Sequence, residues 1–294
     1  MQTNTLELEV YYGTMAPWSN TTLLFSGDRA LLIDAQFTKT DAKALVKRLQ
    51  DAGKTLTHII LTHSHPDHVW GGVELLKAFP EAQAYARPVA ITEMELEFKA
   101  RLLRWTGIFD AELPTELYPV EPFEGDVFDF EGHKIELIDS LPSETINLMT
   151  CYIPELKTYI ASDQCYNRCH YYVGPGLNRP DLWIASIEDI QSRFEIDRVV
   201  PGHGAVGGLE IFDEAIEYLT FYHSVAKPLV PQQEIVHAVL EQYPDWKLEG
   251  VLRMTIGPAV TSKALIEEKN TKQGFGSESI VKGYYRACED GARA

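Results

Sequence analysis

Residues 62–68, THSHPDH, hold three imidazoles and one carboxylate directly after a short apolar run that is typical of a buried strand. Side chains alternate along an extended chain, so His63 and His65 should share one side. A turn at the proline should then bring Asp67 and His68 back toward them. These groups suit a divalent ion such as zinc, and such sites also accept iron or manganese. The segment predicts a metal site; the alternative is a polar loop whose histidines only form hydrogen bonds.

The pattern His63-x-His65-x-Asp67-His68 after a buried strand resembles the signature of the metallo-β-lactamase fold. Asp163, after the strand-like TYIA, resembles the aspartate that bridges the metals in that family. His203, in VPGHG after the strand-like RVV, resembles its final histidine. The resemblance covers residues 6–210. It implies an α/β fold, an αββα sandwich of two mixed β-sheets flanked by helices, with the metals at one sheet edge.

The sequence departs from the family pattern at Glu144. The family carries a Gly-His-Ser/Thr step between a hairpin and the aspartate, and here the matching stretch, residues 141–145, reads LPSET. The resemblance therefore implies a first site in which Glu144 replaces a histidine, beside a second site and a bridging aspartate. The implied ligands are His63, His65 and Glu144 for the first ion, Asp67, His68 and His203 for the second, and Asp163 between them. Alternatively, Glu144 is a solvated loop residue and the first site is weak or empty.

The expected cofactor is a pair of divalent ions, with zinc first and manganese or iron as the alternatives. The carboxylate of Glu144 makes such a centre one charge less positive than the usual set. We therefore expect the water bound there to have a less depressed pKa, and the centre to favour harder metals.

The segment after Asp163 offers further candidates for the chemistry. His170 lies seven residues further along and could be an extra ligand, a proton shuttle or a substrate contact, or an ordinary loop histidine. Tyr166 and Tyr171 could donate hydrogen bonds to a developing oxyanion, or could simply pack. We take Tyr166 and His170, with Asp67, as the catalytic candidates.

The function that the resemblance implies is hydrolysis by a metal-bound hydroxide. Asp67 would orient the nucleophile and pass its proton to the leaving group. The expected substrate is a small acyl compound: a lactone, a thioester or a β-lactam-like amide. The alternative from another class is a metal-binding sensor or interaction protein with little catalysis, which only the departure at Glu144 supports.

The elements that must position these groups alternate between strands and helices. Strand-like runs fill much of residues 6–35, and helix-like patterns follow at 40–49, 69–78 and 90–105. A hairpin across Glu131-Gly132 is expected within residues 126–139. We place a catalytic domain at residues 1–227.

Residues 228–294 are expected to form a helical C-terminal extension packed on that domain, with a helix at 279–292. Helices at 90–105 and after 228 should roof the cleft. Their aromatic side chains could line an apolar pocket, although core packing explains them equally well: Trp105, Phe109, Phe221, Tyr222 and Trp246.

The charge composition limits the classes of molecule that we expect the chain to bind. The 294 residues include 43 acids and 26 bases, a formal net charge of −17, and no basic run is visible. Nucleic acid and anionic membranes need a basic footprint, so we expect neither, and we expect a small-molecule substrate. The N-terminus resembles no secretory signal and four cysteines make no disulfide framework, so we expect a cytoplasmic protein. The oligomeric state stays open, with a homodimer as one option.

Overall fold

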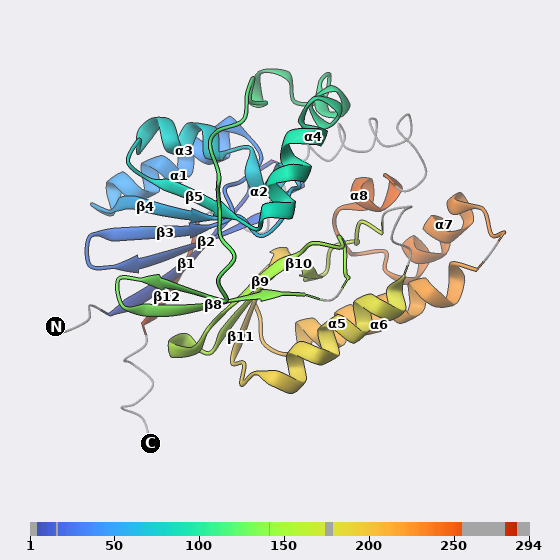
Figure 1. Ribbon diagram of the computed structural model, residues 1–294. Coiled ribbons are helices and arrows are strands. Elements are labelled where there is room, and N and C mark those ends of the chain that lie inside the picture. The colour runs from blue at the N-terminus through green and yellow to red at the C-terminus, as the bar shows by residue number, and fades with distance from the viewer. Residues whose placement is uncertain are drawn as a thin grey trace.

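Two β-sheets lie face to face between helices in the computed structural model, which describes residues 5–15, 17–140, 142–173, 179–227, 229–254 and 280–286 (Figure 1). The first sheet has the order β12-β1-β2-β3-β4-β5-β6 and the second the order β11-β10-β9-β8-β7. Each sheet contains both parallel and antiparallel strand pairs. The pairs β3–β4 and β10–β11 are parallel, whereas β1–β2 and β8–β9 are antiparallel. The expected αββα sandwich of mixed sheets is confirmed.

The strands of the first sheet are β1 (Leu6–Tyr12), β2 (Asn20–Ser26), β3 (Arg29–Ile33), β4 (Thr55–Ile60), β5 (Gln83–Ala86), β6 (Glu121–Pro122) and β12 (Ile280–Arg286). Those of the second are β7 (Val127–Phe130), β8 (His133–Asp139), β9 (Met149–Ile153), β10 (Thr158–Tyr166) and β11 (Arg198–His203). The helices are α1 (Lys39–Asp51), α2 (Pro66–Val69), α3 (Gly72–Ala78), α4 (Pro88–Trp105), α5 (Pro180–Arg193), α6 (Glu210–Val225), α7 (Gln232–Gln242) and α8 (Glu249–Arg253), with short 3-10 turns η1 (Asp110–Glu112) and η2 (Pro154–Leu156).

Three apolar clusters define the layers. The middle cluster joins the facing sides of both sheets and includes Leu8 and Leu31 from one sheet and Phe130 and Ile160 from the other. A second cluster packs the outer face of the first sheet against α1, α3 and α4, and the third packs the second sheet against α5 to α8. Burying both faces of each sheet removes a large apolar area from water, which is the main favourable term in folding.

Local sequence explains the turns that connect these strands. The expected hairpin joins β7 to β8 at Glu131-Gly132, and both residues have positive φ, 55° and 88°. A two-residue turn of this kind needs left-handed backbone at both positions, which matches the twist of the flanking strands. Thr38 caps α1 by accepting a hydrogen bond from the Asp41 amide, and Leu45 and Leu49 of α1 face the core.

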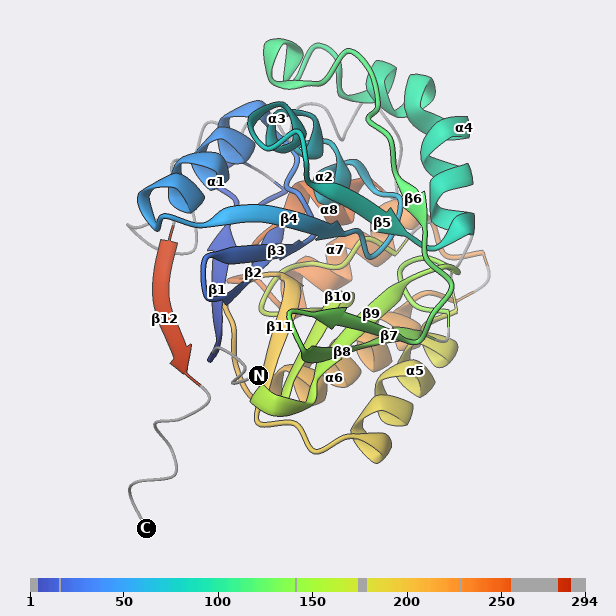
Figure 2. The same ribbon diagram turned by 60° about the vertical axis from the view of Figure 1, so that its left-hand side comes forward.

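The expected helix at 279–292 is wrong over residues 280–286, which form β12 antiparallel to β1 (Figure 2). The pairing sets Glu7 opposite Arg286 and Tyr11 opposite Ile280. The outer strand of a sheet presents unpaired N–H and C=O groups, and β12 satisfies one row of them. Residues 287–292 lie outside the described part of the chain.

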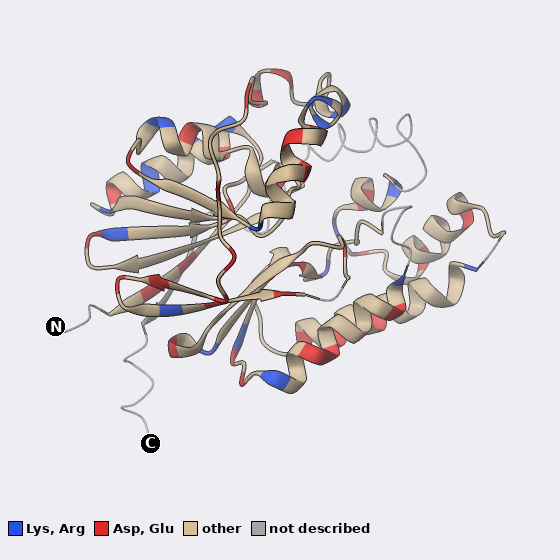
Figure 3. Cartoon of the chain, in the orientation of Figure 1, with Lys and Arg blue, Asp and Glu red and all other residues tan. Residues whose placement is uncertain are grey.

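Helices α7 and α8 share the third cluster with β10, α5 and α6, so these two helices pack on the second sheet. The boundary at residues 227 and 228 stays a prediction. Within the described ranges, no helix is both long enough and apolar enough to cross a membrane. In the part of the chain that the structure describes, basic residues are interspersed with acidic ones and form no continuous stripe (Figure 3).

Candidate metal centre and active site

The THSHPDH segment leaves the end of β4 and turns into α2, as its sequence suggests. His65 stands in extended backbone just before α2, and Pro66 occupies the first helical turn, where its missing N–H costs no hydrogen bond. The one-turn helix therefore returns Asp67 and His68 toward His63. The rings of His63 and His68 lie 4.4 Å apart between centroids.

The second sheet brings three more ligand-type side chains to the same edge. Asp163 lies inside β10, which runs on to Tyr166 instead of ending after TYIA. Ser162 has a positive φ of 45° and the pairing of β10 with β11 shifts register on both sides of it. This bulge re-aims Asp163, as bulges beside active sites commonly do. His203 ends β11, and Glu144 lies in the loop between β8 and β9.

Two groups of potential ligands result, and their members are those expected from the sequence. One group is His63, His65, Glu144 and Asp163; the other is Asp67, His68 and His203. In the first group, Oε2 of Glu144 lies 3.1 Å from Nδ1 of His65 and 3.7 Å from Nε2 of His63. Glu144 thus takes part in the cluster and is not a solvated loop residue.

Asp163 joins the two groups. Its Oδ2 lies 3.7 Å from Nε2 of His63, and its Oδ1 lies 3.1 Å from Nε2 of His68 and 3.4 Å from Nε2 of His203. Gly202 makes room for this carboxylate, because a Cβ there would stand 1.9 Å from Oδ1. The Oδ2 of Asp67 lies 3.5 Å from Nε2 of both His68 and His203.

The inward-facing atoms of these groups fit metal ions. Four buried atoms lack a hydrogen-bond partner, although buried polar groups are nearly always paired. They are Nε2 of His63, Nε2 of His68, Oε2 of Glu144 and Oδ1 of Asp163. Imidazole nitrogens and carboxylate oxygens aimed at a common space are a donor set that holds divalent ions such as zinc.

The opposite nitrogens of the histidines are held by fixed partners. Nδ1 of His68 bonds to Oδ2 of Asp34 at 2.7 Å, and Nδ1 of His203 donates to the Pro17 carbonyl at 2.7 Å. These bonds orient the two rings so that Nε2 of each faces the other ligand-type side chains. The hydroxyl of Thr62 links Asp34 to Nδ1 of His63, at 2.9 Å and 3.0 Å. Asp34 could not be singled out from the sequence, and its φ of 65° is a further irregular backbone conformation at the site.

Burial is the largest influence on the pKa values at the first group. It lowers the pKa of His63 well below its ordinary value and that of His65 to about 3, so both imidazoles are neutral at pH 7, the form that binds metals. Burial, together with the carboxylates of Asp163 and Asp67, raises the pKa of Glu144 well above its usual range. A cation bound there would favour the ionised form of the Glu144 carboxylate.

At the second group, the charges of His68 and Asp163 stabilise each other. Burial alone would raise the pKa of Asp163, but His68 and His203 outweigh it and hold that pKa well below its ordinary value. Burial likewise opposes protonation of His68, while Asp163 and Asp34 raise its pKa well above the usual value.

The structure separates the remaining candidates. Tyr166 is at the centre: its hydroxyl lies 3.1 Å from Oδ2 of Asp163 and 3.3 Å from Oε1 of Glu144. His170 does not lie at the centre. Its side chain is buried beside Tyr218, with Nδ1 3.2 Å from the Tyr218 hydroxyl, and it belongs to neither ligand group. Tyr171 turns its hydroxyl to the backbone of Tyr166 and also packs.

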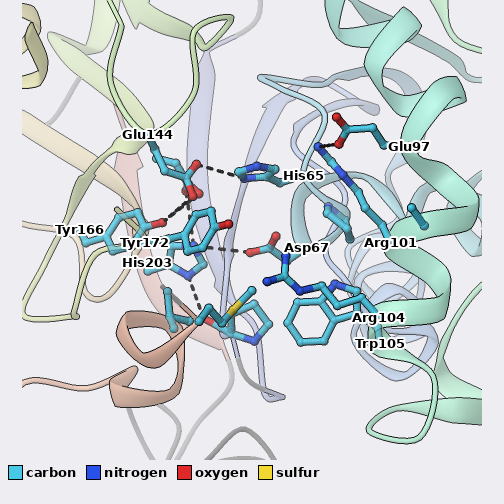
Figure 4. A pocket seen from close by; sticks show the side chains of 16 residues that line it. His65, Asp67, Glu97, Arg101, Arg104, Trp105, Glu144, Tyr166, Tyr172 and His203 are labelled. Carbon is cyan, nitrogen blue, oxygen red and sulfur yellow. Dashed lines mark hydrogen bonds and ion pairs between the residues drawn. The ribbon is translucent and has the colours of Figure 1, made fainter. Parts of the chain in front are cut away.

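A cavity of about 600 Å³ opens over the centre. One wall carries His65, Asp67, Glu144, Tyr166 and His203, and α4 supplies the facing wall (Figure 4). From α4 come Glu97, Ala100, Arg101, Arg104 and Trp105. Their spacing of three to four residues marks one helix face, a signal that could have identified them.

Of the five aromatic side chains proposed to line a pocket, Trp105 lines this cavity. Phe109, Phe221, Tyr222 and Trp246 are not among its lining residues.

Glu93 of α4 joins the two loops that carry the first ligand group. Its Oε2 accepts from the hydroxyl of Ser64, between His63 and His65, at 2.9 Å, and its Oε1 accepts from the amide of Asn147 at 2.7 Å. Asn147 follows Glu144 by three residues. Glu93 thereby fixes the distance between the histidine loop and Glu144.

We expect Glu93→Ala to weaken metal binding at the first group roughly 10- to 100-fold, the usual effect of losing a partner that orients ligands. Competition with a fluorescent chelator would measure it. Glu95→Ala, an exposed neighbour on the same helix, is the control and should leave the affinity unchanged. Equal affinities in Glu93→Ala and wild type would show that the loops hold their positions without this link.

Comparison with known proteins places this geometry in a family. The sequence-family model of the metallo-beta-lactamase superfamily matches residues 19–203, which hold every ligand-type residue of both groups. A metallo-beta-lactamase type 2 from Bacillus cereus is 28% identical over 212 residues, 68% of this chain and 72% of that protein. An atrochrysone carboxyl ACP thioesterase from Aspergillus terreus is 25% identical over 193 residues, 64% of this chain but only 50% of that protein.

Solved structures support the same fold. The crystal structure of the DIM-1 metallo-beta-lactamase matches with a TM-score of 0.56 and 18% identity, covering 74% of this chain and 99% of that one. The family match spans more than half of the 294 residues, and both sequence relatives carry the names of hydrolases. The chain therefore belongs to the metallo-β-lactamase superfamily.

Proposed function

We propose that the chain hydrolyses an acyl bond of a small molecule with the help of two divalent ions. One observation carries the proposal: seven ligand-type side chains from both sheets converge in two groups on one wall of a cavity. Three of the seven are carboxylates and four are imidazoles, a mixture that suits zinc first and also manganese or iron.

The proposed ligands are His63, His65 and Glu144 for one ion and Asp67, His68 and His203 for the other, with Asp163 shared. When bound, the ions would lower the pKa of a water molecule and polarise the acyl carbonyl. In the reaction, the oxygen of water bonds to the acyl carbon, the bond from that carbon to the leaving heteroatom breaks, and the heteroatom takes a proton.

Asp67 and Tyr166 are the residues of the chain that we assign to this proton transfer and to positioning. Asp67 lines the cavity, where its carboxylate can accept a hydrogen bond from the attacking water and return a proton to the leaving group. Tyr166 holds the carboxylates of Glu144 and Asp163 in place through its hydroxyl. His170, buried beside Tyr218, has no role in this scheme.

The candidate bonds are those of a lactone, a thioester or a β-lactam-like amide. The relatives named as a β-lactamase and an ACP thioesterase support the last two classes. A small-molecule substrate, the absence of a nucleic-acid or membrane partner, a cytoplasmic location and a homodimer all stay predictions.

A substrate panel tests the proposal. Purified protein loaded with zinc or with manganese should hydrolyse at least one of an acyl-homoserine lactone, an acyl thioester and a cephalosporin. A chelator should abolish the activity, and adding back the metal should restore it. Hydrolysis that survives complete chelation would contradict the proposal. No turnover of any of the three, by protein with two bound ions, would favour the metal-binding sensor instead.

A further inference from the structure

The wall of the cavity that faces the metal centre carries positive charge. Arg101 and Arg104 of α4 both line the cavity, opposite Glu144 and Tyr166 (Figure 4). In a chain with a net charge of −17, two guanidinium groups on one wall of the active-site cavity need an explanation. Arginine is well suited to binding carboxylate and phosphate because its planar fork can donate two parallel hydrogen bonds.

Arg101 is already engaged by the protein. It donates to the backbone carbonyl and to the hydroxyl of Ser64, and it forms an ion pair with Glu97. Arg101 therefore holds α4 against the histidine loop. Arg104 differs: among the described residues, no carboxylate lies within ion-pair distance of its guanidinium, although the side chain lines the same cavity.

The metal centre itself would carry only a small net positive charge. Two divalent ions carry four positive charges, and Asp67, Glu144 and Asp163 contribute three negative ones when ionised. One positive charge would remain, fewer than with a histidine at position 144. An anionic group on a substrate would thus find in Arg104 a positive charge as large as the net charge of the whole metal centre.

We propose that Arg104 binds an anionic group, a carboxylate or a phosphate, at the end of the substrate away from the scissile acyl bond. This inference rests on the proposed hydrolysis at the same site. Apolar side chains line the cavity together with Arg104 and would contact the part of the substrate that joins its two ends. They include Trp105, Val251 and Met254. The substrate class is therefore an anionic acyl compound with an apolar spacer.

Two esters that differ only in charge test the proposal. Mono-para-nitrophenyl glutarate carries a free carboxylate, and its methyl ester caps that carboxylate while the scissile bond stays the same. Wild type should prefer the anionic ester in kcat/KM. In Arg104→Met, which keeps an unbranched side chain without charge, the ratio of kcat/KM for the anionic to the capped ester should fall at least about tenfold, as expected for loss of a hydrogen bond to a charged group.

Matched variants separate binding from general electrostatics. Lys99→Met removes one exposed positive charge from α4 at a position that does not line the cavity, and should leave the ratio unchanged. Arg104→Lys, which keeps the charge but not the fork, should retain part of the preference. An equal ratio in wild type and Arg104→Met, or an equal fall in Lys99→Met, would overturn the proposal.

Calorimetric titration of the metal-loaded protein keeps the inference testable if neither ester is cleaved. Glutarate and inorganic phosphate are titrated separately, and only affinity that Arg104→Met loses is assigned to Arg104. The anion showing the larger loss identifies the group as carboxylate or phosphate. Loss of affinity without any ester hydrolysis would support the anion site and count against the hydrolase. If an ester is hydrolysed but neither assay depends on Arg104, the result would support the hydrolase and contradict the anion site.

Discussion

Asp163→Asn is expected to lower kcat/KM by at least about a thousandfold on any substrate that the wild type hydrolyses. Asp163 is the residue that faces both ligand groups, through Oδ1 toward His68 and His203 and through Oδ2 toward His63. An amide of the same size carries no charge and offers one oxygen instead of two. The substitution should therefore weaken both metal sites together, and elemental analysis should find less than one ion per chain.

Asp213→Asn is the matched control for this experiment. Asp213 is exposed on α6 and belongs to neither ligand group, so this variant should keep wild-type turnover and metal content. Circular dichroism of the metal-free proteins would check that Asp163→Asn is folded. A folded Asp163→Asn protein with two ions and near wild-type turnover would rule out the shared ligand.

Glu144→Ala should reduce the metal content from about two ions per chain to about one. Oε2 of Glu144 is buried without a hydrogen-bond partner and lies 3.1 Å from Nδ1 of His65, so it is aimed at the first group alone. The second group does not contain Glu144 and should keep its ion. Elemental analysis of protein purified without added metal is the measurement, with turnover recorded on the same samples.

Glu188→Ala, an exposed glutamate on α5, controls for the loss of one negative charge from the chain. One ion in both wild type and Glu144→Ala would mean that Glu144 is not a ligand, whatever its position suggests. Two ions in both would mean that His63, His65 and Asp163 suffice for the first site.

The candidate ligands could be predicted from the sequence because their signals are local. His63, His65, Asp67 and His68 are neighbours, so a strand and a turn are enough to bring them together. Asp163 and His203 each closely follow a short apolar run, TYIA and RVV, and the family resemblance singled them out there. Glu144 followed from the same resemblance, as a departure from its pattern.

Residues that act through distant contacts could not be predicted in this way. On α4, Glu93 and Arg104 look like ordinary charges on a solvated helix face until the histidine loop and the cavity are placed beside them. His170 shows the opposite case. It is near Asp163 in sequence, but the chain leaves β10 and buries its side chain against Tyr218.

Strand β12 was missed for a related reason. Residues 280–286, IVKGYYR, contain the branched and aromatic side chains that favour strands, but a single seven-residue segment forms a strand only where an open edge receives it. That edge, β1, lies at the other end of the sequence. Local periodicity carries no information about such a partner.

The assembly of one metal centre from both sheets has a consequence for unfolding. The histidine loop extends the first sheet, whereas Asp163 and His203 belong to the second, so an ion held by both acts as a reversible cross-link that closes a long loop of chain. The contribution of this cross-link to the free energy of unfolding depends on the free metal concentration, because any ligand that binds only the native state shifts the folding equilibrium by mass action. At low metal concentration, this cross-link is absent. Hydrogen exchange should then show the two halves of the sandwich opening as separate units, and saturating metal should merge them into one.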